Sequence, residues 1–303
     1  MSACGSLHGP MLGVVNLDKP VGPTSHDMVG LLRRLTGSRR IGHAGTLDPL
    51  ASGVLPILIG AATRLSEELT GGEKRYEAVI RLGWRSATDD GEGPLERGDA
   101  PPGEDRVAAA LSGFVGTFDQ RPPAFSARKQ GGRTAHRAAR AGAPLDLPMR
   151  PVTISRIDLI DAEAGDGWLD VRIDLRCGAG TYIRSVARDL GERLGCGGYL
   201  RELRRTEAAG LRVAQAFTPE RLQALASENR LDEALLAPAD LLPLPRLQLD
   251  SVAAGRFLHG SALALPFGSP GRHAVFDGEL LIGIGTLTGG VLQPNKVLVD
   301  ASV

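Results

Sequence analysis

Residues 168–177 alternate apolar and charged side chains more regularly than any other segment of the chain. A period of two is typical of a β-strand with one buried face. The strand runs through glycines at 178 and 180 into a segment of helical periodicity, so residues 182 and 184 fall in the first helical turn. The chain therefore contains a sheet covered by helices. The apolar positions are Leu169, Val171, Ile173 and Leu175 in the strand and Ile183, Val186, Leu190 and Leu194 in the helix.

Other segments predict further strands and helices. A helix begins at Thr24 or Ser25, which are good N-cap residues, and ends at Gly37. Residues 89–105 are polar and rich in Gly and Pro, which predicts a surface loop. The remaining predicted strands are 12–17, 50–60 and the alternating segment that Tyr76 opens, and the remaining predicted helices are 61–69, 107–114 and 134–141.

The C-terminal part of the chain predicts a separate β-rich unit. Residues 234–247 are rich in Ala, Leu and Pro and form a candidate linker, and Gly-containing pairs at 277–278 and 289–290 predict hairpin turns between short strands. The chain of 303 residues is long enough for one large domain or two. We therefore expect a short disordered lead at 1–10, a large domain at 11–245 and a small domain at 246–303.

The formal net charge is zero, with 35 basic and 35 acidic residues, but the charges are unevenly spread. Arginines at 33, 34, 39 and 40 form one basic cluster, and acidic residues gather between 89 and 105. A proline-bounded insertion at 121–150 is basic, and we call it the basic insertion. A neutral total can hide a basic face, although the alternative for each cluster is an ordinary solvated surface. The basic residues of the insertion are Arg121, Arg128, Lys129, Arg133, Arg137, Arg140 and Arg150.

Several classes of protein lack their signatures in this chain. No run of about 18 apolar residues predicts a membrane span, and the N-terminus does not resemble a signal peptide, so we expect a cytoplasmic protein. The three cysteines are far apart and the six histidines are scattered, which argues against a disulfide framework and a metal site. Phosphate-binding glycine motifs and a G-x-S-x-G nucleophile motif are absent.

Asp48 lies on a loop, punctuated by Gly and Pro, just ahead of an apolar segment. Loops on a rigid scaffold commonly carry chemistry, and the neighbours Leu47, Leu50 and Leu55 would keep water away from the carboxylate. An Asp that precedes Pro also commonly starts an Asx-type turn. The segment alone leaves both interpretations open.

Residues 42–53, GHAGTLDPLASG, resemble the signature of the bacterial tRNA pseudouridine synthase B (TruB) family. Three more segments match family motifs in the expected order: NLDKPVGPTSHD at 16–27, KRY at 74–76 and GTYIR at 180–184. The resemblance covers roughly the first two thirds of the chain and weakens beyond. Four ordered motifs are far more specific than any one of them.

The resemblance implies a fold, a reaction and a partner. The fold is α+β, with a large mixed, mainly antiparallel sheet flanked by helices (the pseudouridine synthase fold) and a small C-terminal PUA-like RNA-binding domain. The reaction converts the TΨC-loop uridine 55 of tRNA into pseudouridine without a metal or cofactor. The partner is the T arm and loop of tRNA, and the protein is a monomer.

The family's catalytic aspartate falls on Asp48, which would act on the ribose or the uracil as nucleophile or base. Arg184 would pair with this carboxylate and hold it ionised. Tyr76 would offer an aromatic face to a uracil taken out of its stack. The residues themselves also allow a surface charge at Arg184 and a core residue at Tyr76. Tyr182 and Leu203 match two further positions of the family's pocket.

Three other residues match the family with less defined roles. His43 would insert where flipped bases have left the RNA loop, and Arg64 would contact phosphate. Lys19 is either structural or adjacent to a phosphate. The basic insertion would be the family's mobile thumb, which grips the RNA loop.

The chain departs from the family pattern at Phe125 and His136, where tyrosines are common, and at Ala179, where a lysine is frequent. These departures put contacts of the thumb in doubt more than the reaction. Two alternative functions stay open: a guide-RNA-dependent synthase of the related archaeal and eukaryotic type, and an RNA-binding or folding protein with a vestigial pocket.

Overall fold

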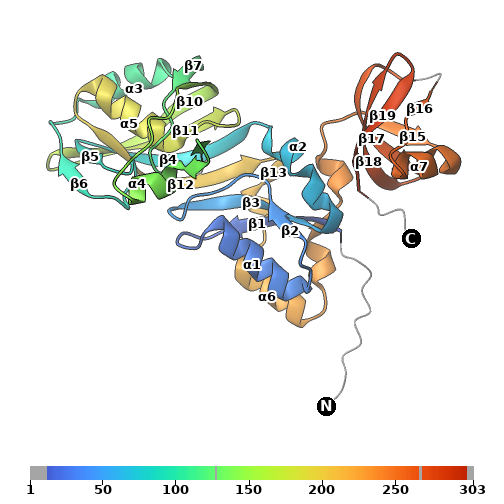
Figure 1. The fold of residues 1–303 in the computed structure, drawn as a ribbon. Helices are drawn as coiled ribbons and strands as arrows, with labels where there is room; N and C mark the ends of the chain where they lie inside the picture. Colours follow the sequence, from blue (N-terminus) through green and yellow to red (C-terminus); the bar gives the residue numbers. More distant parts are fainter. Residues whose placement is uncertain (1–11, 127, 266–267, 299–303) are drawn as a thin grey trace.

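The computed structural model describes residues 12–298 except 127 and 266–267. The expected lead at 1–10 lies outside the described residues. The fold is α+β, as predicted, with a large mixed sheet and a smaller C-terminal sheet that forms a second body (Figure 1).

Ten strands form the large sheet. Its main path runs β14-β1-β3-β12-β4-β11-β10-β7, while β2 pairs with β3 and β13 with β12. Within this sheet, all described strand pairs are antiparallel except β3 with β12, which is parallel. The bounds are β1 Gly13–Lys19, β2 Ile41–His43, β3 Ala51–Ile59, β4 Lys74–Leu82, β7 Gly116–Gln120, β10 Arg150–Gly165, β11 Trp168–Cys177, β12 Gly198–Ala208, β13 Leu211–Arg212 and β14 Leu235–Leu236.

Helices cover both halves of this sheet (Figure 1). Helices α1 (Ser25–Thr36) and α6 (Pro219–Ser227) pack together beside β1, whereas α3 (Glu104–Ser112) packs on β10 and α5 (Ile183–Leu194) on β12 and β4. The predicted caps of α1 are confirmed: Thr24 and Asp27 form a capping box, and Gly37 ends the helix with φ of 69°.

Two long strands, β10 and β12, were not predicted, because β-bulges interrupt their alternation. β10 shifts its register against β11 at two places, and β12 shifts twice against β4. The predicted helix at 61–69 is instead a 3₁₀ helix, Gly60–Leu65, followed by the short helix α2, Ser66–Thr70. The predicted loop at 89–105 overlaps a hairpin of β5 (Trp84–Ser86) with β6 (Leu95–Arg97).

The C-terminal sheet has five strands in the order β15-β17-β18-β19-β16, and both predicted hairpin turns are confirmed. Helix α7 (Ser251–Leu258) places the fully buried Phe257 in a core that belongs to this body. The bounds are β15 Arg246–Leu249, β16 Leu263–Ala264, β17 Gly271–Asp277, β18 Leu280–Thr288 and β19 Val291–Val297.

The two bodies meet at α2 and the 3₁₀ helix before it. Leu65 shares an apolar cluster with Phe276 of β17, and burial of such surfaces is the main attraction between packed units. Around this cluster Arg272 pairs with Glu68 at 2.6 Å and Lys296 with Glu67 at 2.8 Å. The C-terminal body is thus docked on the segment that follows β3.

In the basic insertion, β8 (Lys129–Gln130) and β9 (Arg133–Thr134) pair and lead into α4 (Ala135–Arg140). Among the residues that the structure describes, no helix is both long and apolar enough to cross a membrane.

Candidate active site

Asp48 lies on the loop between β2 and β3, and this loop is fixed from several sides. Ser25 Oγ donates to the Leu47 carbonyl at 2.9 Å and accepts from the Leu47 N–H at 2.8 Å. The Gly22 N–H donates to the Pro49 carbonyl at 2.8 Å. The turn at Asp48 uses its main-chain carbonyl, which accepts from the Ala51 N–H at 3.0 Å. The carboxylate of Asp48 therefore stays available for another partner.

Arg205 of β12 supports the same loop from inside the protein. Its guanidinium is fully buried and donates to the carbonyls of Gly45 at 3.0 Å, Thr46 at 3.4 Å and Val54 at 2.7 Å. The parallel pairing of β3 with β12 sets Arg205 opposite Gly53, which brings the buried cation under the loop that carries Asp48. The sequence analysis did not single out Arg205, because a charged residue in a strand is usually exposed.

The partner of Asp48 is Arg184, in the first turn of α5. Arg184 Nη2 lies 2.9 Å from Asp48 Oδ2, and Nη1 lies 3.4 Å from Asp90 Oδ2. Only 6% of the Arg184 side chain is exposed, against 38% of that of Asp48. A surface charge at Arg184 is therefore excluded. The buried guanidinium joins a partly exposed carboxylate to a buried one, a geometry that a forked side chain favours.

Asp90 is a site residue that the sequence analysis missed. The sequence predicts a surface loop at 89–105, but only 3% of Asp90 is exposed. Asp89, with φ of 62°, turns the chain, and Thr88 Oγ1 donates to Asp90 Oδ1 at 2.5 Å. Two adjacent aspartates before a glycine gave no indication of burial, since such runs are typical of exposed turns.

A pocket of about 300 Å³ opens beside Asp48, and we call it the Asp48 pocket. Its walls combine the carboxylate of Asp48, aromatic and aliphatic side chains, and three buried cations, Lys74, Arg184 and Arg205. The predicted residues Tyr76, Tyr182 and Leu203 all line it. Its lining includes Asp48, Tyr76, Tyr182, Arg184, Leu203 and Arg205.

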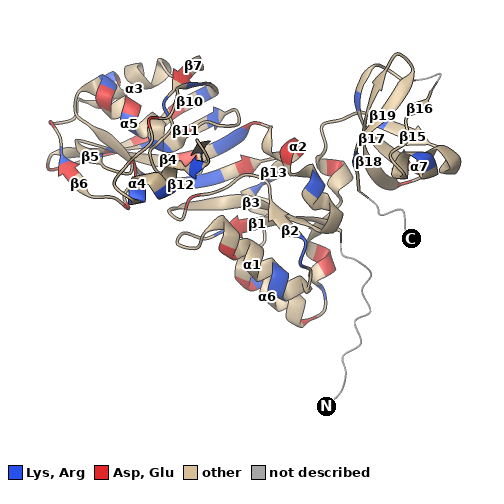
Figure 2. Cartoon of the chain, in the orientation of Figure 1, with Lys and Arg blue, Asp and Glu red and all other residues tan. Residues whose placement is uncertain are grey.

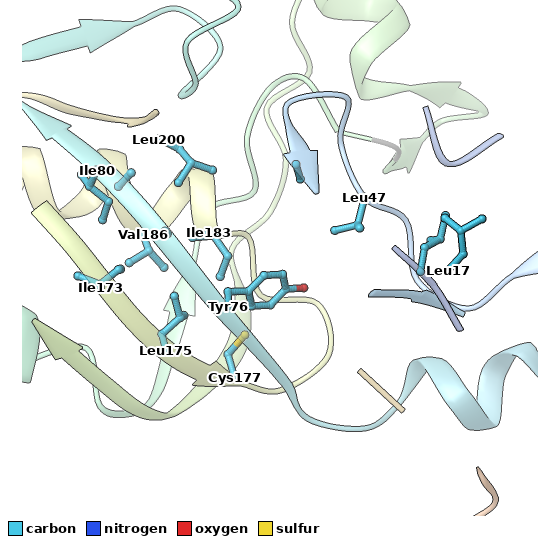
Figure 3. Close-up of a cluster of buried hydrophobic side chains, with 14 of the residues drawn as sticks. Leu17, Leu47, Tyr76, Ile80, Ile173, Leu175, Cys177, Ile183, Val186 and Leu200 are labelled. Atoms are coloured by element: carbon cyan, nitrogen blue, oxygen red, sulfur yellow. The ribbon is translucent and has the colours of Figure 1, made fainter. Parts of the chain in front are cut away.

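Tyr76 both belongs to the core and lines the pocket. Figure 3 shows its ring among Leu175, Cys177 and Ile183, with the hydroxyl directed toward the side on which Leu47 lies. Burial raises the pKa of the Tyr76 hydroxyl, so the side chain is neutral at physiological pH. The predicted burial of Cys177 is also confirmed.

The chain around Tyr182 is held by one amide side chain. Gln120, at the end of β7, accepts from the Tyr182 N–H at 2.9 Å and donates to the Tyr182 carbonyl at 3.1 Å. Tyr182 is the N-cap residue of α5. These two hydrogen bonds fix the turn between β11 and α5, and therefore the position of Arg184 in the first turn of α5.

Three residues predicted to bind substrate lie outside the lining of the Asp48 pocket. Lys19 is fully buried and donates to the carbonyls of Pro20 and Pro23, each at 2.8 Å, which favours its structural role. Arg64 is exposed and donates to the Val297 carbonyl of the C-terminal body. His43 is half-buried in β2, where burial lowers its pKa.

Burial also affects the charge of Lys19. Desolvation lowers its pKa to about 8, although the nearby negative charge of Asp48 opposes the shift. A third, longer contact of 3.5 Å joins Lys19 Nζ to the Pro49 carbonyl, directly after Asp48. Lys19 thus supports the loop that carries Asp48 through main-chain oxygens.

The basic insertion contacts the site through its first residues. Arg184 Nη2 donates to the Phe125 carbonyl at 2.9 Å, and the His136 N–H of α4 donates to the Ser126 carbonyl at 3.0 Å. The departures Phe125 and His136 therefore both take part in fixing this segment. A second pocket of about 230 Å³, which we call the Arg140 pocket, lies here and is lined by Asp48, Thr88, Asp90, Ser126, Arg140 and Arg184, among others.

The arginines of the sheet and those of the insertion differ in their pairing. On the sheet, Arg75 pairs with Asp174 at 2.5 Å and Arg81 with Asp170 at 2.7 Å. Within the described part of the chain, by contrast, no carboxylate lies within 4.0 Å of the cationic groups of Arg121, Arg128, Arg133, Arg137 and Arg140. Figure 2 shows basic residues on α4. These unpaired cations give the neutral chain a local positive field.

No group of three or more His, Cys, Asp or Glu side chains in the described ranges is arranged to hold a metal ion.

Comparison with known proteins decides the family. Residues 33–183 match the family model described as TruB family pseudouridylate synthase (N terminal domain), and residues 184–246 match the tRNA pseudouridylate synthase B C-terminal domain. The chain belongs to the TruB family. Among curated TruB relatives, it is 41% identical over 290 residues to tRNA pseudouridine synthase B of Aromatoleum aromaticum, with 94% of this chain and 92% of that protein covered. It is also 41% identical to the protein of that name from Ralstonia nicotianae, over 94% of each chain.

Solved structures share the fold of this TruB-family chain. A chain from an H/ACA RNP bound to a substrate RNA containing 2'-deoxyuridine matches with a TM-score of 0.73 and 25% identity, over 96% of this chain and 86% of that one. A chain from a Cbf5-Nop10-Gar1 complex matches with a TM-score of 0.72 and 26% identity, over 95% and 85%. The pseudouridine synthase fold predicted from the sequence is therefore confirmed.

Proposed function

We propose that this protein is a stand-alone tRNA pseudouridine synthase that isomerises uridine 55 in the T loop. The observation that carries the proposal is the carboxylate of Asp48, held 2.9 Å from a buried guanidinium at the edge of a pocket of about 300 Å³. The aromatic ring of Tyr76 lines the same pocket. Full-length relatives named tRNA pseudouridine synthase B support the same substrate.

The reaction needs no co-reactant, because substrate and product are isomers. The bond between C1' of the ribose and N1 of the uracil breaks, the freed uracil turns, and a bond forms between C1' and C5. The proton on C5 leaves to solvent and N1 gains one. Asp48 assists either by attacking C1' or by removing a proton from the ribose.

The other pocket residues hold the flipped nucleotide in place. Arg184 orients the carboxylate of Asp48 through the ion pair between the two side chains. Tyr76 stacks on the uracil, and Leu203 and Tyr182 complete the walls around the base. The target must leave the stacked loop first, because a stacked base cannot reach Asp48.

The unpaired arginines of the basic insertion bind the phosphates of the T arm, in the manner of a thumb that closes over the RNA loop. His43 fills space left by flipped bases, and Arg64 adds a phosphate contact at the border with the C-terminal body. That body, residues 246–303, acts as a PUA-like RNA-binding domain beside the catalytic domain of 11–245.

The relatives favour a stand-alone enzyme over the guide-RNA-dependent alternative. The proteins that are 41% identical carry the name tRNA pseudouridine synthase B, whereas the ribonucleoprotein components are 25–26% identical. We propose that the enzyme acts as a monomer in the cytoplasm. The association of Asp48, Tyr76 and Arg184 in one site argues against a vestigial pocket.

The proposal is tested with purified protein and an unmodified tRNA transcript that carries tritium on C5 of uridine. Wild-type protein should release about one tritium per tRNA without any other RNA, and mapping should place the product at position 55. A transcript with cytidine at position 55 is the matched control and should release none. A requirement for a guide RNA, or binding of the transcript without tritium release, would overturn the stand-alone enzyme.

A further inference from the structure

Ser126, in the basic insertion, has a buried hydroxyl for which the described part of the chain offers no hydrogen-bond partner. Only 4% of the residue is exposed, and no described group lies within hydrogen-bonding distance of its Oγ. Two other buried serines of the site region differ. Ser25 Oγ makes two hydrogen bonds with Leu47, and Ser185 Oγ donates to the Arg121 carbonyl at 2.9 Å. A buried hydroxyl that lacks a partner lowers folding stability by about 1–3 kcal/mol, so the Ser126 hydroxyl destabilises the free protein.

The position of Ser126 shows where a partner would come from. Ser126 lines both the Asp48 pocket and the Arg140 pocket. Its main chain is fixed on both sides, by the Arg184 contact to Phe125 and by the His136 contact to its own carbonyl. A serine side chain has one rotatable bond, and rotation about this bond changes the direction of the hydroxyl without moving the main chain.

The two pockets differ in what they offer a nucleotide. Tyr76 and Leu203 line the Asp48 pocket alone, which suits a base. Asp48 and Arg184 line both pockets, so the ribose of the reacting nucleotide lies at their border. The Arg140 pocket adds a polar lining of both charge signs, with Arg140 beside the carboxylates of Asp90 and Glu92, which suits the hydroxyls of the sugar and the adjacent phosphate.

We propose that Ser126 is a substrate-binding residue whose hydroxyl forms a hydrogen bond with the sugar-phosphate part of the flipped nucleotide. The inference rests on the proposed function and adds a contact to it. RNA provides the missing partner of the hydroxyl. The free protein therefore keeps an unsatisfied group that only the complex satisfies.

The first test compares folding stabilities. Ser126→Ala removes an unpaired hydroxyl, so its free energy of unfolding in urea should equal or exceed that of the wild type. Ser25→Ala is the matched control, because it removes a buried hydroxyl with two partners and should lower stability. A loss in Ser126→Ala as large as that in Ser25→Ala would show that the hydroxyl is already paired, and would overturn the proposal.

The second test measures binding in the Asp48→Asn background, which keeps the RNA unreacted. Adding Ser126→Ala should weaken the binding of a T-arm RNA about 3- to 10-fold, the usual worth of one hydrogen bond. The same loss should appear with an RNA whose target nucleotide is abasic, because it retains the sugar and phosphate. Ser126→Cys keeps the size with a weaker donor and should fall between. Ser227→Ala, exposed at the end of α6, should leave the affinity unchanged.

Two results would overturn the contact. Equal affinity with and without the Ser126 hydroxyl excludes it, and a loss confined to the RNA with an intact base places it on the uracil. Neither result affects the proposed function, which fails separately if the wild-type protein forms no pseudouridine in tRNA.

Discussion

Arg184 and Asp48 meet at 2.9 Å although they come from different elements, the first turn of α5 and the loop before β3. The guanidinium is buried and the carboxylate is partly exposed, so the pair has one fixed member and one member that faces the pocket. This arrangement orients the carboxylate while leaving one side of it open to the Asp48 pocket.

Arg184 also neutralises Asp90, and its removal should therefore have two separable effects. Arg184→Met leaves Asp90 as a buried charge without its cation, and stability should fall by about 3–5 kcal/mol. The double variant Arg184→Met/Asp90→Asn should recover much of that stability in urea unfolding but none of the activity. Recovery of both properties would contradict a direct role of Arg184 at Asp48.

Tyr76 should act through its ring. Tyr76→Phe keeps the aromatic face, so its affinity for tRNA in the Asp48→Asn background should stay within about twofold of the parent. Tyr76→Leu removes stacking worth about 1–3 kcal/mol, which corresponds to a loss of affinity of about 5- to 150-fold. Equal affinities of the Phe and Leu variants would show that the ring does not stack on the base.

Gly53 should not tolerate a side chain. Its φ is 104°, and a Cβ atom there would lie 2.2 Å from the main-chain oxygen of Arg205 in the paired strand. Gly53→Ala should therefore cost about 3 kcal/mol or more in urea unfolding. Gly72→Ala, where no atom lies within 4 Å of the added Cβ and φ is not positive, should change stability little. Similar stabilities of the two variants would contradict the close approach of β3 to β12.

The sequence predicted the site residues that match motifs or pocket positions of the family. It did not predict the residues whose role depends on their burial in the folded protein. Asp48, Tyr76, Tyr182, Arg184 and Leu203 were all predicted, and all line one pocket. Short segments of characteristic sequence identify Asp48, Tyr76, Tyr182 and Arg184, so no knowledge of the tertiary structure is needed to find them.

Asp90, Arg205 and Ser126 could not be found in this way. The burial of Asp90 depends on Arg184, which is distant in sequence, and that of Arg205 depends on the parallel pairing of β3 with β12. The strands β10 and β12 could not be predicted from the sequence either, because their β-bulges interrupt the alternation of side chains that identifies a strand. Lys19 belongs to the first motif and Arg64 matches a position where the family usually has a basic residue, but their side chains contact main-chain carbonyls outside the Asp48 pocket.

Lys19 should make stability depend on pH. Its pKa is lowered to about 8 in the folded protein and is about 10.4 in the unfolded chain. Between these values the unfolded chain binds more protons, so the contribution of Lys19 to stability rises with pH, by about 1.4 kcal/mol per pH unit. The difference in unfolding free energy between wild type and Lys19→Met should therefore shift in favour of the wild type between pH 8 and 10. A constant difference would contradict the burial of this charge.

The role of Asp48 is tested most directly by Asp48→Asn, measured for binding and for single-turnover product formation on the same tRNA transcript. The side chain keeps its size but loses its charge and most of its nucleophilicity. We expect binding within a few-fold of the wild type, with an affinity that falls steeply as salt is raised, and no detectable pseudouridine. Product formation at the wild-type rate would contradict the assignment of Asp48 as the catalytic residue.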